Sequence, residues 1–229
     1  MKIIAIQHDA ADPPAMAGEI ALQLGHEITT IRLDRGDKIP TTADADMLMS
    51  FGGGISLTND EQPDWVAAEQ QLIRQYADSG RRVLGICLGS QMVATALGAT
   101  VRRNREPEVG WHNIYRMETA KSAIANLFPE SQKVFHWHQD TFGIPDGAEH
   151  LFRSDGCDHQ GFTIEGRIVA LQFHLEANEK TVSTFLAVSK LWRQEKPFVA
   201  SENEINAGTQ KYLPAQKALL EKLLNQMTK

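Results

Sequence analysis

The chain has 229 residues and a mass of 25.5 kDa, with 42% hydrophobic and 23% charged residues, which excludes a disordered, collagen-like or fibrous protein. No apolar run reaches the roughly 18 to 20 residues of a membrane-spanning helix, and the apolar start at Met1–Gln7 is too short for a signal peptide. The net charge of −6, with scattered basic residues and only two cysteines, argues against nucleic-acid binding and a disulfide framework. We therefore expect a cytoplasmic protein that binds neither nucleic acid nor membrane.

Short apolar runs alternate with helical patterns in the first half of the chain. The predicted strands are 1–7, 27–33, 47–51 and 82–86, and the predicted helices are about 13–24, 61–79 and 89–98. This alternation is typical of a parallel sheet with crossover helices on both faces.

The second half is richer in strands. Candidates are 100–103, 109–118, 133–138, 149–154, 159–164 and 168–173, followed by helices at 178–192 and about 214–227. Short turns between several of these strands indicate antiparallel pairs. We predict an α/β fold with a mostly parallel, flavodoxin-like central sheet, flanking helices and an appended antiparallel group. No linker divides the chain, so 1–229 is expected to be a single domain with a C-terminal helical extension from about 193.

The segment Gly85-Ile86-Cys87-Leu88-Gly89 puts a cysteine where a predicted strand turns directly into a helix. This pattern is a cysteine version of the nucleophile elbow, in which a Cβ at either glycine would crowd the neighbouring strand and helix. The helix N-terminus favours a thiolate. A lone cysteine is more often buried and inert, and Cys157 is interpreted in that way. For Cys87, the glycine spacing favours the nucleophile.

Two further segments lie at the ends of predicted strands. His174 and Glu176 are two residues apart, so on an extended chain they point to the same side, where Glu176 can orient a His174 base. The glycines of Phe51-Gly52-Gly53-Gly54 can direct bare N–H groups at a developing oxyanion. Because open α/β sheets bind ligands at the carboxyl ends of their strands, the three segments are expected to meet there.

In this order and near this spacing, the three segments resemble a class I glutamine amidotransferase domain. Glu108-Val109-Gly110-Trp111 and the segment from His136 to Phe142 are similar to stand-alone proteins related to the glutaminase domain of GMP synthase. The resemblance covers roughly residues 1–192.

The resemblance implies a role for each matching residue. Cys87 would be the nucleophile, His174 the general base and acid, and Glu176 its orienting partner. The backbone N–H groups of Gly53 and Leu88 would form the oxyanion hole. The residues assigned to substrate binding are Gly52, Gln91, His138 and Gln139. The implied reaction hydrolyses the side-chain amide of glutamine through a γ-glutamyl thioester.

Two positions depart from the family pattern. Gly54 stands where the family usually has proline, which leaves the oxyanion loop more conformational freedom. Leu175 stands where many members have proline, although leucine occurs in the relatives that this chain most resembles. Neither change touches Cys87, His174 or Glu176.

Three functions stay open. The first is glutamine hydrolysis, with a separate synthase subunit as the acceptor of ammonia; the second is a free-standing γ-glutamyl peptidase or hydrolase; the third is a non-catalytic binding or regulatory module. No cofactor is expected. His136 and His138 are assigned a pocket-lining or structural role rather than a metal site, because no spacing supplies three or four convergent ligands.

Overall fold

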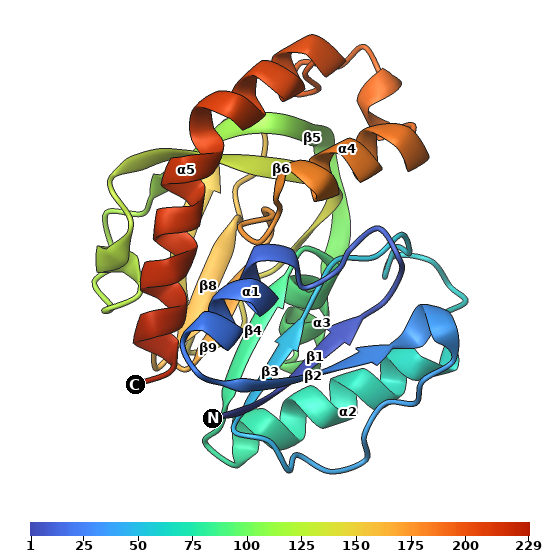
Figure 1. Ribbon diagram of the computed structural model, residues 1–229, viewed down its shortest axis with the longest axis vertical. Helices are drawn as coiled ribbons and strands as arrows, with labels where there is room; N and C mark the ends of the chain where they lie inside the picture. The colour runs from blue at the N-terminus through green and yellow to red at the C-terminus, as the bar shows by residue number, and fades with distance from the viewer.

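The computed structural model, which describes residues 1–229, is built on a nine-stranded mixed sheet in the order β2-β1-β3-β4-β9-β8-β7-β5-β6 (Figure 1). The strands are β1 (Lys2–Gln7), β2 (Glu27–Arg32), β3 (Met47–Ser50), β4 (Arg82–Ile86), β5 (Val101–Arg116), β6 (Ser131–Phe142), β7 (Glu149–Ser154), β8 (Gly161–Ile164) and β9 (Ile168–Leu171). The helices are α1 (Ala15–Gln23), α2 (Asp64–Asp78), α3 (Leu88–Ala96), α4 (Glu179–Val188) and α5 (Glu202–Met227), with short 3-10 helices at Leu33–Arg35, Ala125–Leu127 and Leu191–Arg193.

The parallel half of the sheet consists of β2, β1, β3, β4 and β9. Its registers align the carboxyl ends of neighbouring strands, since Ile6 pairs with Ser50, Ser50 with Gly85, and Ile86 with Leu171. The segments that follow β1, β3, β4 and β9 therefore emerge side by side at one edge of the sheet, as predicted for ligand sites in such folds.

The prediction of a mostly parallel sheet was wrong in its proportions. Strands β8, β7, β5 and β6 are all paired in antiparallel fashion, and β9 joins the two halves by pairing with β4 on one side and β8 on the other. The difference arises because the antiparallel strands are part of the same sheet as the parallel ones rather than a small appended group. The predicted strands 100–103 and 109–118 are one long strand, β5, which forms an extended hairpin with β6.

Helices cover both faces of the parallel half. The core on one face includes α1 and α5, whereas the core on the other includes α2 and α3. Figure 1 shows α1 beside α5, and the two helices pack on each other although they lie at opposite ends of the chain. No helix combines the length and the apolar character needed to cross a membrane.

The last helix is much longer than predicted. Helix α5 begins at Glu202 with a capping box in which the Ser201 side chain accepts from the Glu204 N–H, and it continues through Pro214. The sequence prediction took this proline as a helix start, which is its usual position. Conversely, α4 ends at Val188 rather than at 192, and a 3-10 turn follows.

Candidate active site

Cys87 occupies a strained turn between β4 and α3. Its backbone has φ 53° and ψ −111°, and it forms the N-cap of α3. A Cβ at Gly85 would lie 2.6 Å from the Gly89 carbonyl oxygen, and a Cβ at Gly89 would lie 2.1 Å from the Ser50 carbonyl oxygen. Only glycine therefore allows α3 to start this close to β3 and β4. The turn directs the Cys87 side chain to the carboxyl edge of the sheet, and Sγ lies 3.9 Å from the Trp137 carbonyl oxygen.

His174 and Glu176 follow β9 and face the same side, as the spacing predicts. The His174 Nδ1–H donates to Glu176 Oε1 at 2.8 Å, and both side chains are 1% exposed. Burial opposes a charge on His174, but Glu176 and the neighbouring Cys87, which is within hydrogen-bonding reach, raise its pKa well above 6.5. The arrangement therefore favours a protonated His174 between the Glu176 carboxylate and the Cys87 side chain.

Gly53 and Leu88, whose backbone N–H groups are the predicted oxyanion donors, line the same pocket as Cys87. Leu88 opens α3, so its N–H has no intrahelical partner, and the Gly53 N–H takes no part in the hydrogen bonds of the surrounding loops. A Cβ at Gly53 would lie 2.7 Å from Leu88 Cδ2, so the loop and the helix start pack tightly. The Gly89 N–H donates to the Phe51 carbonyl at 2.9 Å and fastens the helix start to this loop.

A buried network that sequence reasoning missed holds the glycine loop from behind. The His8 Nδ1–H donates to the Gly52 carbonyl at 3.0 Å, and His8 Nε2 lies 2.7 Å from Glu69 Oε2. The Ser50 hydroxyl donates to Glu69 Oε1 at 2.6 Å. Burial opposes the charge on His8, but Glu69 outweighs it and raises the pKa of the imidazole. The Gly52 carbonyl shares one planar peptide with the Gly53 N–H, so this network fixes the direction of that N–H.

Gly54 is anchored rather than free. Its N–H donates to Asp9 Oδ2 at 2.9 Å, a bond that the proline usual at this position cannot make. Asp9 Oδ1 also accepts from the N–H of Ala11 at 2.7 Å, so one carboxylate links the two loops. The freedom expected from glycine is thus offset by a hydrogen bond.

Asp12 is a buried carboxyl on the other side of the glycine loop. A Cβ at Gly52 would lie 2.0 Å from Asp12 Oδ1 and 3.0 Å from His174 Cε1, which explains why this position has no side chain. Burial raises the pKa of Asp12 to about 8; His174 opposes this shift, while Asp9 and Glu176 add to it.

Cys87 and His174 line one pocket of about 540 Å³ together with Asp9, Asp12 and the glycines 53 and 54. Of the residues predicted from the sequence, the pocket brings together Cys87, His174, Gly53, Leu88, Gln91, His138 and Gln139. Glu176 and Gly52 do not line the pocket. Glu176 lies behind His174, and Gly52 is the part of the glycine loop that packs against Asp12. Gln91 donates to Gln172 Oε1 at 3.2 Å, and Gln139 accepts from Arg103.

Helix α5 fastens the loop that carries His174. Gln216, which is completely buried, accepts from the Phe135 N–H at 2.9 Å and donates to the carbonyls of His174 and Ala177 at 3.1 and 3.3 Å. This residue lies outside the range of the motifs, and no local signal marks it in the sequence.

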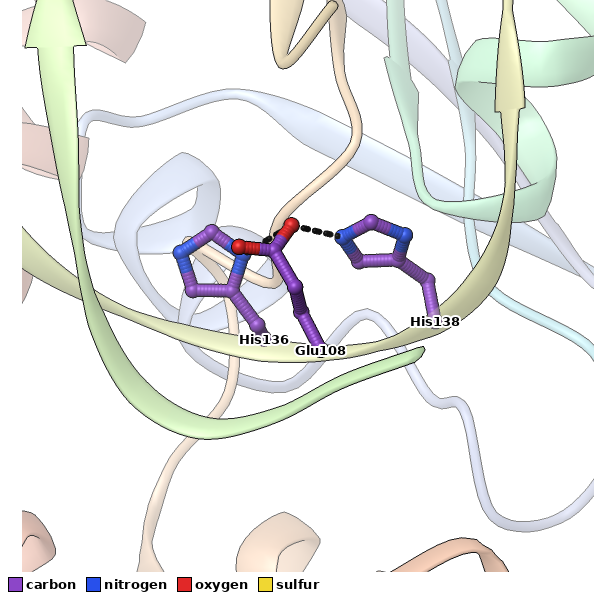
Figure 2. A group of neighbouring side chains, drawn as sticks. All are labelled: Glu108, His136 and His138. Carbon is purple, nitrogen blue, oxygen red and sulfur yellow. Dashed lines mark ion pairs between the residues drawn. The ribbon is translucent and has the colours of Figure 1, made fainter. Parts of the chain in front are cut away.

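A second buried cluster lies beside the pocket, on β5 and β6. Figure 2 shows the Glu108 carboxylate between the imidazoles of His136 and His138. Burial opposes ionisation of Glu108, but the two imidazoles and Ser154 lower its pKa to about 2. Burial lowers the pKa of His136 to about 3. Sequence reasoning considered both histidines but not the carboxylate that β5 places between them.

Comparison with known proteins supports the resemblance stated above. A family profile described as glutamine amidotransferase class-I matches residues 19–193. The glutamine amidotransferase-like protein YfeJ of Salmonella typhimurium is 33% identical over 215 residues, which cover 90% of each chain. A crystal structure of a glutamine amido transferase from Methylobacillus flagellatus superposes with a TM-score of 0.92 at 25% identity, over 99% of this chain and 94% of the other.

Two enzymes match part of the chain. γ-Glutamyl peptidase 4 of Arabidopsis thaliana is 28% identical over 123 residues, which are 52% of this chain and 49% of that protein. The glutamine-hydrolysing GMP synthase of Aeropyrum pernix is 29% identical over 124 residues, which are 54% of this chain and 24% of that enzyme.

Proposed function

Because the chain belongs to the class I glutamine amidotransferase family, we propose that it hydrolyses the side-chain amide of glutamine through a thioester on Cys87. The observation that carries this proposal is the position of Cys87. Its side chain stands at a strained helix start beside His174, which is itself bonded to Glu176. A nucleophile, a base and a group that orients the base are the parts that acyl transfer needs.

The first half of the reaction forms the acyl-enzyme. The Cys87 thiolate attacks the amide carbon, and the oxygen that becomes negative accepts from the N–H groups of Gly53 and Leu88. The carbon–nitrogen bond then breaks as the His174 imidazolium gives its proton to the leaving nitrogen. Ammonia departs, and the γ-glutamyl group stays on sulfur as a thioester.

The second half releases glutamate. His174, now neutral, takes a proton from a water molecule, whose oxygen attacks the thioester carbon. The carbon–sulfur bond breaks, glutamate leaves, and the Cys87 thiolate and the His174 imidazolium are restored. Glu176 holds the imidazole in position throughout and stabilises its charged form.

The size of the pocket favours a second candidate substrate. A cavity of about 540 Å³ lies within the range of about 300–1,000 Å³ that accommodates drug-sized ligands, and a lone glutamine side chain leaves part of it free. Asp9 and Lys190 on its wall carry opposite charges that suit an α-amino and an α-carboxylate group. A γ-glutamyl peptide would undergo the same chemistry, with an amine in place of ammonia as the leaving group.

The likeness to GMP synthase supports a third element, a separate acceptor subunit. That enzyme is much longer than the matched segment, which covers 24% of it. In this proposal the acceptor for the ammonia is another protein, and it would raise the rate of glutamine hydrolysis when added.

Glutamate and ammonia release from glutamine and from a panel of γ-glutamyl dipeptides tests the proposal. We expect turnover by the wild type, none by Cys87→Ala, and normal turnover by Cys157→Ala, which removes the other buried cysteine. Preference for glutamine supports a glutaminase, and preference for dipeptides supports the peptidase. Turnover of neither by folded protein, even with co-purifying proteins added, contradicts both and leaves a binding module.

A further inference from the structure

Glu108, His136 and His138 converge because of the β5–β6 register. Glu108 on β5 pairs directly with His138, and His136 lies two residues from His138 on the same face of β6. Each residue offers one possible ligand atom, and these three atoms all lie within 4.8 Å of one another. Glu108 and His136 are completely buried, and His138 is 4% exposed (Figure 2).

The hydrogen bonds of His138 leave its second nitrogen facing a carboxylate. Its Nδ1 lies 3.0 Å from the Asp140 carbonyl oxygen, which only accepts, so Nδ1 carries a hydrogen. Nε2 lies 3.1 Å from Glu108 Oε2 and 3.4 Å from Gln160 Nε2, which can donate to it. The long contact with the Gln160 amide brings no positive charge to Nε2, whose lone pair stays close to a carboxylate oxygen. A proton or a metal ion between these two atoms would remove the repulsion.

His136 supplies a third donor that nothing in the protein uses. Both of its ring nitrogens are buried and lack a hydrogen-bond partner, and Nδ1 lies 3.9 Å from the same Glu108 oxygen. A buried polar atom without a partner destabilises the folded protein. A proton between Glu108 and His138 leaves this destabilisation in place, whereas a metal ion bound by all three residues removes it for Nδ1.

We propose that Glu108, His136 and His138 bind one divalent cation, and that their donor set selects Zn²⁺. Two imidazoles and one carboxylate are a common set of three protein ligands for zinc, with bonds of about 2.0–2.2 Å. Ligand atoms of a tetrahedral zinc site lie about 3.4 Å apart, so the 3.1 Å separation from the Glu108 oxygen would widen slightly and the 3.9 Å separation would shorten when an ion binds. The proposal departs from the expectation of no metal site, because the carboxylate that completes the ligand set comes from another strand.

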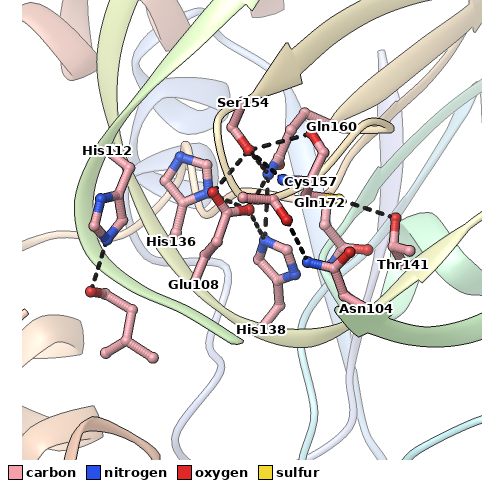
Figure 3. Close-up of polar contacts among 12 residues, drawn as sticks. Asn104, Glu108, His112, His136, His138, Thr141, Ser154, Cys157, Gln160 and Gln172 are labelled. Carbon is pink, nitrogen blue, oxygen red and sulfur yellow. Dashed lines mark hydrogen bonds and ion pairs between the residues drawn. The ribbon is translucent and has the colours of Figure 1, made fainter. Parts of the chain in front are cut away.

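The surroundings support the ligands as an outer shell does in metal proteins. The Ser154 hydroxyl donates to Glu108 Oε1 at 2.7 Å, and Gln160 donates to Glu108 Oε2 (Figure 3). The Asp140 carbonyl accepts from His138. His138 also lines the large pocket, which gives an ion a route to the site and gives water a route to the fourth position. A bound ion would fix the pocket wall that His138 forms.

The experiment uses full-length Cys87→Ser protein, because a cysteine and a histidine in the active site could themselves bind zinc. The protein is stripped with a chelator, Zn²⁺ is added, and retained metal is counted after gel filtration. We expect one ion per chain, lost in His136→Gln and in His138→Gln. Ser154→Ala should weaken binding by about 10–100-fold, as loss of a supporting residue does.

His150→Gln is the matched control, because His150 and His159 form a second histidine pair with ring centroids 5.1 Å apart. We expect it to bind zinc like its parent. X-ray absorption of the zinc-loaded parent makes the test independent of how the variants fold, and two imidazole ligands are expected. No retained zinc, binding unaffected by His136→Gln in folded protein, or a first shell without two imidazoles overturns the proposal, whatever the amidase activity.

Discussion

In the proposed mechanism, the direction of the Gly52–Gly53 peptide group decides whether the glycine loop can stabilise an oxyanion. Gly53 can offer its N–H to an oxyanion only while the Gly52 carbonyl points the other way, toward His8. His8 is in turn held by Glu69, which lies 61 residues away in the sequence. These residues do not reach the substrate, so they position the loop rather than take part in the reaction.

Glu69→Gln tests this positioning. The amide cannot hold a charged His8, so the Gly52–Gly53 peptide loses its fixed orientation. We expect kcat to fall by about 10-fold or more, less than the ~10²–10³-fold loss of an oxyanion donor, with KM nearly unchanged. The exposed Glu61→Gln serves as control. An unchanged kcat in a folded Glu69→Gln protein would show that the network is only structural.

Glu176 sets the pH range in which His174 keeps its proton. Its negative charge helps to raise the pKa of His174 well above 6.5 against the effect of burial. In Glu176→Gln the pKa of His174 falls, so the proton for the leaving nitrogen is lost at lower pH. We expect the alkaline limb of the kcat profile to move to lower pH and kcat to fall by ~10²-fold or more. Steady-state rates across pH check this, with the exposed Glu179→Gln as control; coincident alkaline limbs would refute it.

The buried carboxyl of Asp12 is expected to make the stability of the protein depend on pH, in a direction that its pKa defines. Its pKa is about 8 in the folded protein, against the ordinary value of 3.8, so the folded state holds a proton that the unfolded state releases between these values. Stability contributed by this group therefore falls as pH rises from about 4 to 8. Asp12→Asn should remove this loss of stability. The free energy of unfolding of the variant should therefore exceed that of the wild type most above pH 8.

Urea unfolding of both proteins from pH 4 to 9 measures this difference directly. The exposed Asp78→Asn gives the background for loss of one carboxylate. Parallel curves for the wild type and Asp12→Asn would mean that Asp12 ionises in the folded protein as it does in the unfolded chain.

Among the elements, α5 has a role that its position in the sequence conceals. The family profile ends at residue 193, whereas α5 starts at Glu202 and reaches back to the site through Gln216. The same side chain accepts from β6 through the Phe135 N–H. The helix thus joins the antiparallel hairpin to the loop that carries His174.

Gln216→Ala breaks all three hydrogen bonds of this link and leaves buried backbone groups without partners. We expect the free energy of unfolding to fall by about 3 kcal/mol, since each such group costs about 1–3 kcal/mol. Activity should fall as well, because the His174 carbonyl loses its anchor. Chemical unfolding and kcat measure the two effects beside the exposed Gln210→Ala; equal stability of the two variants would contradict the role of Gln216.

At the scale of the whole molecule, local signals predicted the parallel half well. Strands and helices up to α3 lie within a few residues of their predicted ranges, because each has its own periodicity and its own glycine stop. The family assignment from the Cys87 and His174 motifs was also confirmed. Strand pairing in the second half depends on long-range register, which period and turn signals do not contain, so the sheet proved more antiparallel than predicted.

The candidate site divides in the same way. Residues close to a glycine motif or a strand end were predicted from the sequence and line one pocket. His8, Glu69 and Gln216 were missed because each acts through a partner far away in the chain. Glu108 was seen as part of a motif, but the register that places it against His136 and His138 exists only in the folded sheet.

Detection of the covalent intermediate tests the central claim most directly. Wild-type protein is mixed with glutamine, or with a γ-glutamyl dipeptide, and quenched in acid within the first turnovers. Intact mass and peptide mapping then locate any added group. We expect one γ-glutamyl group on the peptide that contains Cys87, and none in Cys87→Ala. Turnover without an adduct, or an adduct at Cys157, would contradict the thioester mechanism.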